Sequence, residues 1–206
     1  GRTDLGMLRR FSETWITDWQ LHPNAFRITN GVSVALPPEF INRLVGGQNS
    51  YMTGELQTQM RNLLFAYPSI AVVKPNYVEH NPGMLAEIRR NVEIYKNFVR
   101  PMLPDSDIFH HTPELPGAFA TGYGVLELAA HDKSRGIIGV FRLAEADGDA
   151  AVVYPRGIDP AKTYRVTLDN TRSATEVSGF ELANGGLRIR LPGALTSELV
   201  LFEAIG

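Results

Sequence analysis

The most constraining feature of this sequence is a change in hydrophobic periodicity near residue 120. Before that point, apolar residues recur every three or four positions, as in amphipathic helices. After it, short runs rich in β-branched and aromatic residues alternate with turns of Gly, Asn and Asp. The pattern predicts two regions, a helix-rich one over residues 1–120 and a strand-rich one over residues 121–206.

Three helices are expected in the first region. The clearest covers Met84–Arg100, where apolar residues share one face and Pro101 follows directly. A second is expected over Gly54–Tyr67, ended by Pro68, and a third over Asn24–Ala35. The first two segments have an apolar face, whereas the third contains β-branched residues and Gly31.

The rest of the chain is predicted to be a connection followed by an antiparallel sandwich. Met102–Phe119 contains Pro and Gly without a clear period, which favours a connection between domains. Asn184-Gly185-Gly186 is typical of a hairpin turn. The seven predicted strands are Gly124–Leu128, Gly136–Leu143, Ala151–Tyr154, Thr163–Asp169, Ala174–Ser178, Leu187–Leu191 and Glu198–Glu203.

Composition excludes several classes of protein. The 206 residues are 44% apolar and 20% charged, which argues against collagen, coiled coils and wholesale disorder. The sequence has no Cys, so it has no disulfides, thiolate zinc sites or Cys nucleophiles. A net charge of −2 and a pI near 6.2 favour neither nucleic acid nor an anionic membrane as partner. No apolar run approaches the roughly 20 residues of a membrane span.

No metal or phosphate site is predicted. His110 and His111 are adjacent, and adjacent side chains point apart in regular structure, so we expect a loop pair instead of a metal site. Asp147-Gly148-Asp149 is expected to be a turn, because the other ligands of a calcium loop are missing. The Gly-containing segments lack the spacing of phosphate-binding loops.

The first twenty residues hold the strongest functional pattern. They contain both tryptophans, Trp15 and Trp19, together with several carboxylates. Carbohydrate sites combine these groups, because sugar C–H faces stack on indole rings while hydroxyls need polar acceptors. The alternative is that Trp15 belongs to the core and the carboxylates to the surface.

The order of residues in this segment favours the carbohydrate interpretation. Gly1-Arg2-Thr3-Asp4-Leu5-Gly6-Met7-Leu8, followed by Trp15-Ile16-Thr17-Asp18, resembles a motif pair of glycoside hydrolase family 36, the α-galactosidases or melibiases. In that family Gly-Arg-x-Asp-x-Gly-Met-Leu is followed by Trp-x-Ser-Asp, and Thr17 stands here in place of the Ser. The motif match covers about twenty residues, and the resemblance in architecture extends over the chain.

The resemblance implies a fold and a set of roles. The family has a (β/α)8 barrel followed by an antiparallel sandwich, and the Asp of Trp-x-Ser-Asp is its acid/base residue. Asp18 would have that role here, with Trp15 and Trp19 as sugar-contacting residues. Gly1 would end a turn that approaches the sugar, and Arg2 and Asp4 would give structural support, Asp4 also as a cap of the helix starting near Leu5. The alternative for Asp18 is a helix cap or a surface ion pair.

The resemblance also implies that part of the catalytic machinery lies upstream of Gly1. A (β/α)8 barrel needs about 250 residues, and the family's nucleophile, in a Lys-x-Asp sequence, precedes the motif pair; no such string occurs here. Residues 1–120 are thus expected to be the last strands and helices of the barrel, and residues 121–206 the sandwich, with this chain alone inactive. The resemblance implies an α-galactoside oligosaccharide as substrate and no metal or organic cofactor. A homo-oligomer is possible at this stage.

Two alternative functions stay open at this stage. The chain could be a non-catalytic module whose sandwich binds carbohydrate or forms an oligomer interface. It could also be a barrel that kept the fold and lost the chemistry. The sequence does not specify the sugar, the linkage, the oligomeric state or the compartment.

Overall fold

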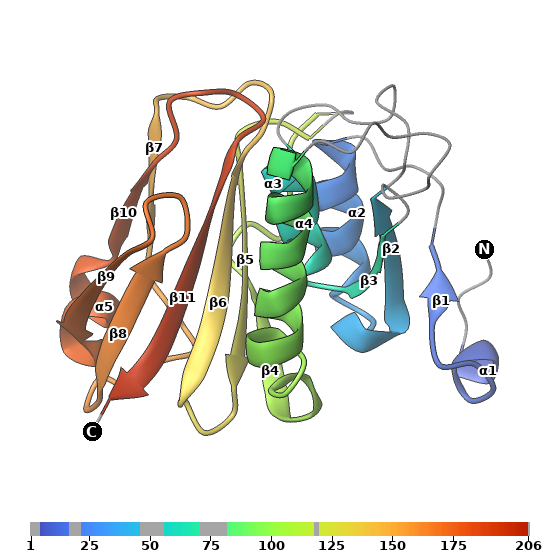
Figure 1. Cartoon of the computed structure of the whole chain (residues 1–206), viewed down its shortest axis with the longest axis horizontal. Helices are drawn as coiled ribbons and strands as arrows, with labels where there is room; N and C mark the ends of the chain where they lie inside the picture. The colour runs from blue at the N-terminus through green and yellow to red at the C-terminus, as the bar shows by residue number, and fades with distance from the viewer. Residues whose placement is uncertain (1–4, 17–21, 46–55, 71–81, 118–119, 206) are drawn as a thin grey trace.

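The computed structural model describes residues 5–16, 22–45, 56–70, 82–117 and 120–205 (Figure 1). The first part of the chain alternates short strands with helices. Its elements are α1 (Leu5–Leu8), β1 (Thr14–Trp15), α2 (Asn24–Val32), a 3-10 turn (Pro38–Phe40), β2 (Ile41–Val45), α3 (Leu56–Leu63), β3 (Tyr67–Ile70) and α4 (Pro82–Ile94), which continues as a π-helical turn (Tyr95–Val99).

The second part is dominated by antiparallel strands. After a 3-10 turn (Leu103–Asp105), its elements are β4 (Ser106–His110), β5 (Tyr123–Ala130), β6 (Arg135–Arg142), β7 (Ala150–Val153), β8 (Thr163–Leu168), β9 (Ser173–Ser178), α5 (Gly179–Gly185), β10 (Leu187–Arg190) and β11 (Ser197–Ile205). A six-stranded sheet has the order β4-β5-β6-β11-β8-β9, and β10 pairs with β7 in a sheet of two strands.

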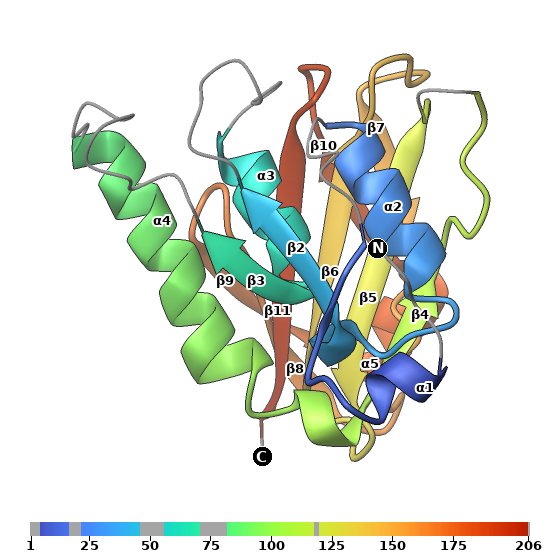
Figure 2. The same cartoon turned by 90° about the vertical axis from the view of Figure 1, so that its right-hand side faces the viewer.

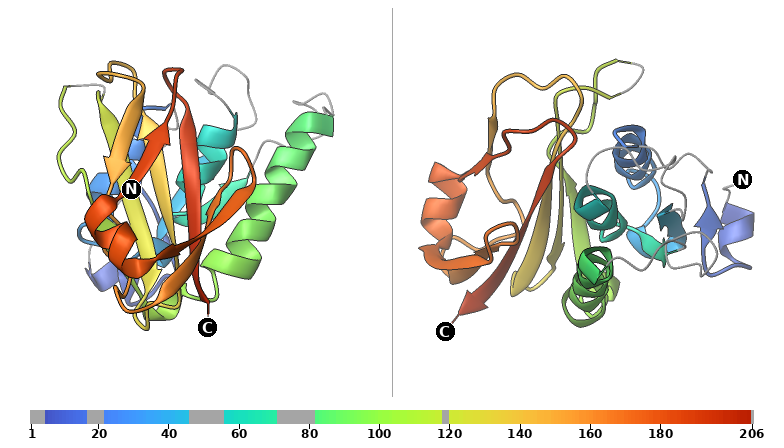
Figure 3. Two further views of the ribbon diagram at one scale, coloured as in Figure 1. Left: turned by 90° about the vertical axis from the view of Figure 1, so that its left-hand side faces the viewer. Right: turned by 45° about the horizontal axis from the view of Figure 1, so that its top comes forward.

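The elements stack in layers, which Figures 1 and 3 show edge-on. A three-stranded parallel sheet, β1-β2-β3, forms the first layer. Helices α2, α3 and α4 form the next, and the six-stranded sheet follows, so that the helices contact both sheets. The two-stranded sheet β7-β10 and α5 cover the far side of the six-stranded sheet.

Burial on both faces explains the long apolar runs of the central strands. On β6, Ile137 and Phe141 pack toward the helices, while Ile138 and Val140 pack toward β7 and β10. All four side chains are fully buried. The sheet therefore forms the shared wall of two hydrophobic cores, and its residues alternate between them along each strand.

Most predicted elements are confirmed. The structure contains all three expected helices and all seven expected strands, with ends that differ by a few residues. The alternation of solvent-exposed and buried side chains that was expected along β8 is also present, since Tyr164 and Val166 are buried while Thr163 and Arg165 are exposed. Within the described part of the chain, every helix is too short or too polar to cross a membrane.

The predicted end of the second helix is wrong. That helix stops at Leu63, and Pro68 lies inside β3 instead of terminating the helix. Pro has no backbone N–H to donate to a neighbouring strand. It is tolerated in β3 because β3 is the edge strand of the described sheet and has a strand on one side only.

Two turn and connection predictions are also wrong. The expected connection over Met102–Phe119 contains β4, which pairs with β5 and forms one edge of the six-stranded sheet. Asn184 and Gly185 end α5, and Gly186 has a φ of +68° as its C-cap, so this segment is not a hairpin turn. The domain boundary near residue 120 stays a prediction, although β4 already belongs to the C-terminal sheet.

Candidate functional site

The carboxyl ends of three parallel strands define the candidate site. β1, β2 and β3 end at Trp15, Val45 and Ile70, and because the strands are parallel these ends share one edge of the sheet. Figure 2 shows this sheet from the side that faces away from the C-terminal sheet. In folds made of βα units, substrates bind at the carboxyl ends of the strands.

Trp15 is the one predicted site residue that the structure places. It is the last residue of β1, and its side chain is 38% exposed. Asp18 and Trp19 follow the end of β1 within residues 17–21, and Gly1, Arg2 and Asp4 fall within residues 1–4; all five lie outside the described residues. Helix α1 begins at Leu5, where Asp4 was expected to cap a helix.

A row of side chains crosses the sheet beside Trp15. Trp15 pairs with Asn42 on β2, and Asn42 pairs with Tyr67 on β3. Residues in register lie on the same face of a sheet. Asn42 donates a hydrogen bond from Nδ2 to Ser69 Oγ at 3.0 Å, while its buried Oδ1 has no hydrogen-bond partner among the described residues.

This row lies on the face that the helices leave free. Val45, three positions beyond Asn42, packs against Met60 and Leu63 of α3, so the face of Asn42 points away from that helix. Tyr67 is 44% exposed on it. Parallel sheets are normally covered on both faces, and this one presents the partly exposed rings of Trp15 and Tyr67, which fit the C–H faces of a sugar.

The row was not recognised from the sequence, apart from Trp15. Asn42 and Arg43 stand between the apolar residues of Ile41–Val45, and a polar pair inside a short apolar run was the available signal. Tyr67 was expected in a helix. Their convergence depends on parallel pairing between strands that are far apart in the chain.

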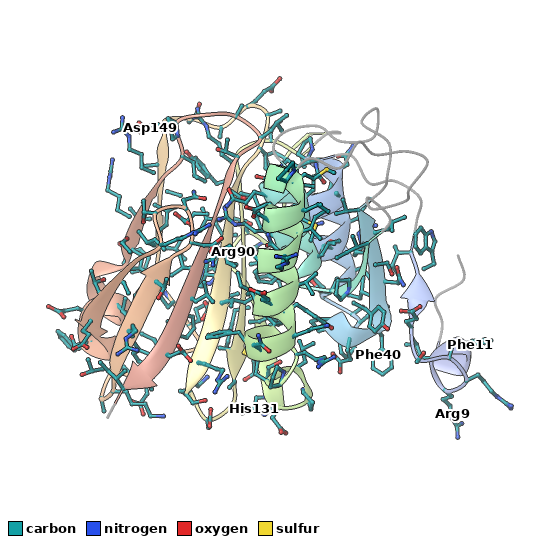
Figure 4. All side chains as sticks on the ribbon, in the orientation of Figure 1. Arg9, Phe11, Phe40, Arg90, His131 and Asp149 are labelled. Carbon is teal, nitrogen blue, oxygen red and sulfur yellow. The ribbon has the colours of Figure 1, made fainter. Side chains whose placement is uncertain are left out.

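Helix α3 links this layer to the C-terminal sheet through buried charges. Arg61 is fully buried and donates from Nη2 to Asp169 Oδ2 at 2.6 Å and from Nη1 to the Ser197 carbonyl at 2.7 Å. Arg90 on α4 pairs with the other oxygen of Asp169 (Figure 4). We call Arg61, Arg90, Asp169 and Glu198 the interlayer ion cluster, because Glu198 Oε1 lies 3.8 Å from Arg61 Nη2.

The pKa values of the two carboxyl groups in the cluster are shifted in opposite directions. Burial alone would raise the pKa of Asp169, but hydrogen bonds and charges from Arg61 and Arg90 outweigh it and hold the pKa below its ordinary value. Burial raises the pKa of Glu198, only partly offset by the Asn170 N–H and the Arg61 charge. The cluster thus holds Asp169 firmly ionised between two cations.

The adjacent histidines have separate partners. His110 ends β4, where a loop pair was expected, and its Nε2 lies 2.9 Å from Ser33 Oγ on α2. His111 Nε2 lies 2.6 Å from Glu127 Oε2, and Glu127 also accepts from the backbone N–H groups of Arg156 and Gly157. The described residues contain no group of three His, Asp or Glu that could hold a metal ion.

His22, four residues after Asp18, gives a pH-dependent prediction. It is 2% exposed, and burial lowers its pKa to about 4. An unfolded His titrates near 6.5, so folding favours the neutral form. The contribution of neutral His22 to the free energy of unfolding is fully present above pH 6.5, and we expect up to about 3 kcal/mol of it to be lost as the pH drops toward 4.

Denaturant unfolding between pH 7 and 4 would measure this loss. His22→Gln should flatten the pH profile, whereas the matched change at the exposed His131, 56% accessible at its side chain, should leave the profile unchanged. Equal profiles for the wild type and His22→Gln would contradict the prediction.

Comparison with known proteins agrees with this geometry. Residues 124–202 match the model of the glycosyl hydrolase family 36 C-terminal domain. No curated protein matches the sequence. The fold resembles the galactosidase domain of the α-galactosidase-sucrose kinase AgaSK, with 18% identity, a TM-score of 0.78 and 97% of this chain covered.

Two further solved structures are similar. One is a double variant of the GH36 α-galactosidase AgaA from Geobacillus stearothermophilus in complex with raffinose, at 18% identity, a TM-score of 0.79 and 97% coverage. The other is the α-galactosidase from Lactobacillus brevis, at 17% identity, a TM-score of 0.78 and 98% coverage. This chain spans only 27%, 27% and 28% of the three relatives, respectively.

The fold, in which parallel βα units precede an antiparallel sheet, matches that of the C-terminal region of the solved α-galactosidases. Residues 124–202 resemble the C-terminal domain of glycosyl hydrolase family 36, and the chain has the fold of the C-terminal region of the family's α-galactosidases. This confirms the family predicted from the first eighteen residues. The family match lies at the other end of the chain, so the two observations are independent.

Proposed function

We propose that this chain is the C-terminal part of a retaining α-glycosidase, specifically an α-galactosidase that removes terminal α-galactosyl residues from oligosaccharides. The observation that carries the proposal is that β1, a strand of a parallel sheet, ends at Trp15 and leads toward Asp18. The row Trp15-Asn42-Tyr67 lies on the free face of this sheet, three residues before the carboxyl ends of β2 and β3. In a closed barrel that face is the interior, where the carboxyl ends of the strands surround the substrate.

The proposed chemistry needs two carboxyl groups. A nucleophilic carboxylate attacks the anomeric carbon while the acid protonates the leaving glycosidic oxygen, which breaks the bond and forms a glycosyl-enzyme ester. The residue that acted as the acid, now deprotonated, then removes a proton from water, and this water attacks the anomeric carbon and releases the nucleophilic carboxylate. Asp18 has the acid/base role in this proposal.

The nucleophile belongs to the part of the barrel that this chain does not include. In a retaining enzyme the two carboxyl groups lie about 5 Å apart, so the strand that carries the second one must be part of the same barrel. The chain spans 27–28% of its α-galactosidase relatives, which leaves ample length for those strands.

The substrate class is supported by the relatives and by the row of side chains. Solved family 36 α-galactosidases hold raffinose and stachyose, which are α-galactosides. Trp15, which is 38% exposed at the end of β1, would stack on a sugar ring. No metal or organic cofactor takes part in this chemistry.

The direct test compares the 206-residue chain with a protein extended by its natural upstream sequence. We expect turnover of a nitrophenyl α-galactoside only by the extended protein, and an Asp after a barrel strand in the added sequence, in a Lys-x-Asp string. Activity of the short chain alone would refute the assignment of the nucleophile to an upstream segment. Failure of the extended protein to hydrolyse any α-galactoside would refute the function.

A further inference from the structure

Strand β9 forms one edge of the six-stranded sheet, and no described strand pairs with its outer side. Residues 171–176, which cover the end of the preceding turn and most of β9, are all exposed. β9 lies on the opposite side of the molecule from β1 and the N-terminus (Figure 1). An open strand edge presents backbone N–H and C=O groups that can pair with another chain.

The other edge strand of this sheet, β4, is in contact with the helix layer. Residues 33–39 lie beside β4, and Ser33 Oγ is 2.9 Å from His110 Nε2. Asn30 Nδ2 also donates to the Thr112 carbonyl, just beyond β4, at 2.9 Å. Of the two edge strands, β9 is therefore the one available for pairing.

The sequence of β9 lacks the features that usually prevent pairing at a sheet edge. Natural edge strands carry Lys or Pro, contain a bulge, or are very short. β9 is Ser-Ala-Thr-Glu-Val-Ser, six residues with one charge, and it pairs with β8 in an uninterrupted register. Such a strand can accept a further strand by main-chain hydrogen bonding.

The charges at this edge are self-complementary. Arg172 lies two residues before Ala174, and Glu176 lies two residues after it. Both are exposed, and neither takes part in an ion pair among the described residues. When two antiparallel copies of β9 meet at Ala174, residue 172 of each copy lies opposite residue 176 of the other. A twofold axis repeats every contact, so this register places both arginines opposite glutamates.

The uncharged residues at this edge suit the same register. Ala174 would meet its own copy at the axis, where two methyl groups let the backbones approach to strand-pairing distance. Phe180, two residues beyond β9, is 65% exposed and places an aromatic ring next to the edge. Aromatic residues are enriched in interfaces between protein chains.

We propose that the β9 edge is the contact between two copies of this chain, related by a twofold axis at Ala174. The two six-stranded sheets then form one continuous antiparallel sheet. Glu176 lies between Arg172 of the other copy and Arg165 of its own chain, which is opposite it on β8. This charge complementarity selects a second copy of the chain, instead of an unrelated peptide, as the occupant of the edge. The inference concerns assembly and does not depend on the proposed catalytic chemistry.

The experiment measures the mass of the full-length enzyme by sedimentation velocity at micromolar concentrations. Glu176→Arg places arginines opposite each other at both ends of the contact. We expect the dissociation constant of the contact to rise at least about 100-fold, because like charges then face each other twice. The mass of the assembly should fall by half. Arg172→Glu should have the same effect through opposed glutamates.

Glu203→Arg is the matched control. Glu203 is exposed on β11, and it lies opposite the same Arg165 from the other side. Both variants therefore add the same charge beside the same arginine, but Glu203 is two strands away from the edge. Glu203→Arg should leave the mass of the assembly unchanged.

Mixing the two edge variants tests the register itself. Glu176→Arg carries two cations at the contact and Arg172→Glu carries two anions, so a mixed pair restores both ion pairs. We expect the mixture to reassociate although each variant alone stays dissociated. A monomeric wild type, an unchanged mass for Glu176→Arg, an equal loss for Glu203→Arg or a mixture that stays dissociated would each overturn the proposal. If one edge variant does not fold, the other is judged alone against Glu203→Arg.

Discussion

Replacing Asp18 with Ala in the full-length enzyme is expected to reduce kcat/KM for raffinose by about 10²–10⁴-fold. The sugar leaving group of raffinose is a poor one, and in the proposed role Asp18 would protonate the glycosidic oxygen and so stabilise this group as the bond breaks. Without that proton the departing oxygen would carry a full negative charge in the transition state. The loss should therefore appear in the step that forms the glycosyl-enzyme.

The dependence on the leaving group distinguishes this effect from general damage. For 2,4-dinitrophenyl α-galactoside, kcat/KM should change little in Asp18→Ala, because that phenolate needs almost no protonation. Its kcat should still fall, since Asp18 would also activate the water that releases the sugar. The glycosyl-enzyme then accumulates, and KM falls together with kcat.

Azide gives a second readout for the same variant. A small anion can enter the space left by the carboxyl group and attack the glycosyl-enzyme without a general base. We expect azide to restore turnover of the dinitrophenyl substrate and to give α-galactosyl azide, because two successive inversions retain the configuration. The product is identified by its anomeric NMR coupling.

Asp4 provides the matched control. It lies in the same motif segment, and its expected role is structural, next to α1 at Leu5. Asp4→Ala should show neither leaving-group dependence nor azide rescue, and its cost should appear as a stability loss of about 1 kcal/mol, typical of a lost helix cap. If Asp4→Ala shows the azide-rescue pattern and Asp18→Ala does not, the roles of the two carboxylates are reversed.

The strands that were predicted best are those buried on both faces. β5 and β6 are long apolar runs between turn signals, and their burial against two cores makes the pattern strong in the sequence. β1 and β2 were not predicted, because one has two residues and the other, Ile-Asn-Arg-Leu-Val, mixes apolar and polar side chains. Of these polar side chains, Asn42 lies on the face that points away from α3, whereas Arg43 is buried on the opposite face.

Helix α5 was missed although it carried a local signal. Ser178 and Glu181 form a capping box, in which each side chain bonds the backbone N–H of the other residue. The spacing Ser-x-x-Glu is visible in the sequence, but Asn184-Gly185-Gly186 suggested a hairpin turn. The two Gly residues instead end a helix, a role that local sequence alone does not distinguish from a hairpin.

Only the residues of the candidate site that belong to one short sequence motif were predicted. Trp15 was identified through the motif that it shares with Asp18. Asn42 and Tyr67 join it through parallel pairing, which depends on how α2 and α3 pack and not on any short pattern. The interlayer ion cluster was missed for the same reason, because Arg61 and Asp169 are 108 residues apart.

Removing Asp169 is expected to have the largest effect on stability. Asp169→Ala leaves buried Arg61 with Glu198, 3.8 Å away, as its nearest carboxylate, and breaking one side of a buried ion pair costs about 3–5 kcal/mol. Arg61 keeps the Ser197 carbonyl as an acceptor, but that carbonyl does not neutralise its charge. Denaturant unfolding of the variant and the wild type at pH 7 measures the difference.

The control for this prediction is Asp149→Ala. Asp149 also pairs with an arginine, Arg190, at 2.7 Å, but both side chains are largely exposed at the outer end of β7 (Figure 4). Water solvates both charges when that pair is broken, so we expect little change in stability. Equal losses in the two variants would show that the buried position of Asp169 does not matter.

The effect of Asp169 should also depend on pH in a defined direction. Its pKa in the folded protein lies below the ordinary value of 3.8, so its ionised form favours folding. That contribution is fully present above about pH 4 and is lost as the pH falls through the lowered folded pKa. Asp169→Asn should lack this acid limb. Because Asp169 joins Arg61 of α3 and Arg90 of α4 to the C-terminal sheet, the variant should also loosen both helices, which hydrogen exchange of their amides would detect. Unchanged exchange in α3 and α4 at a reduced global stability would show that the cluster stabilises the fold without linking the two layers.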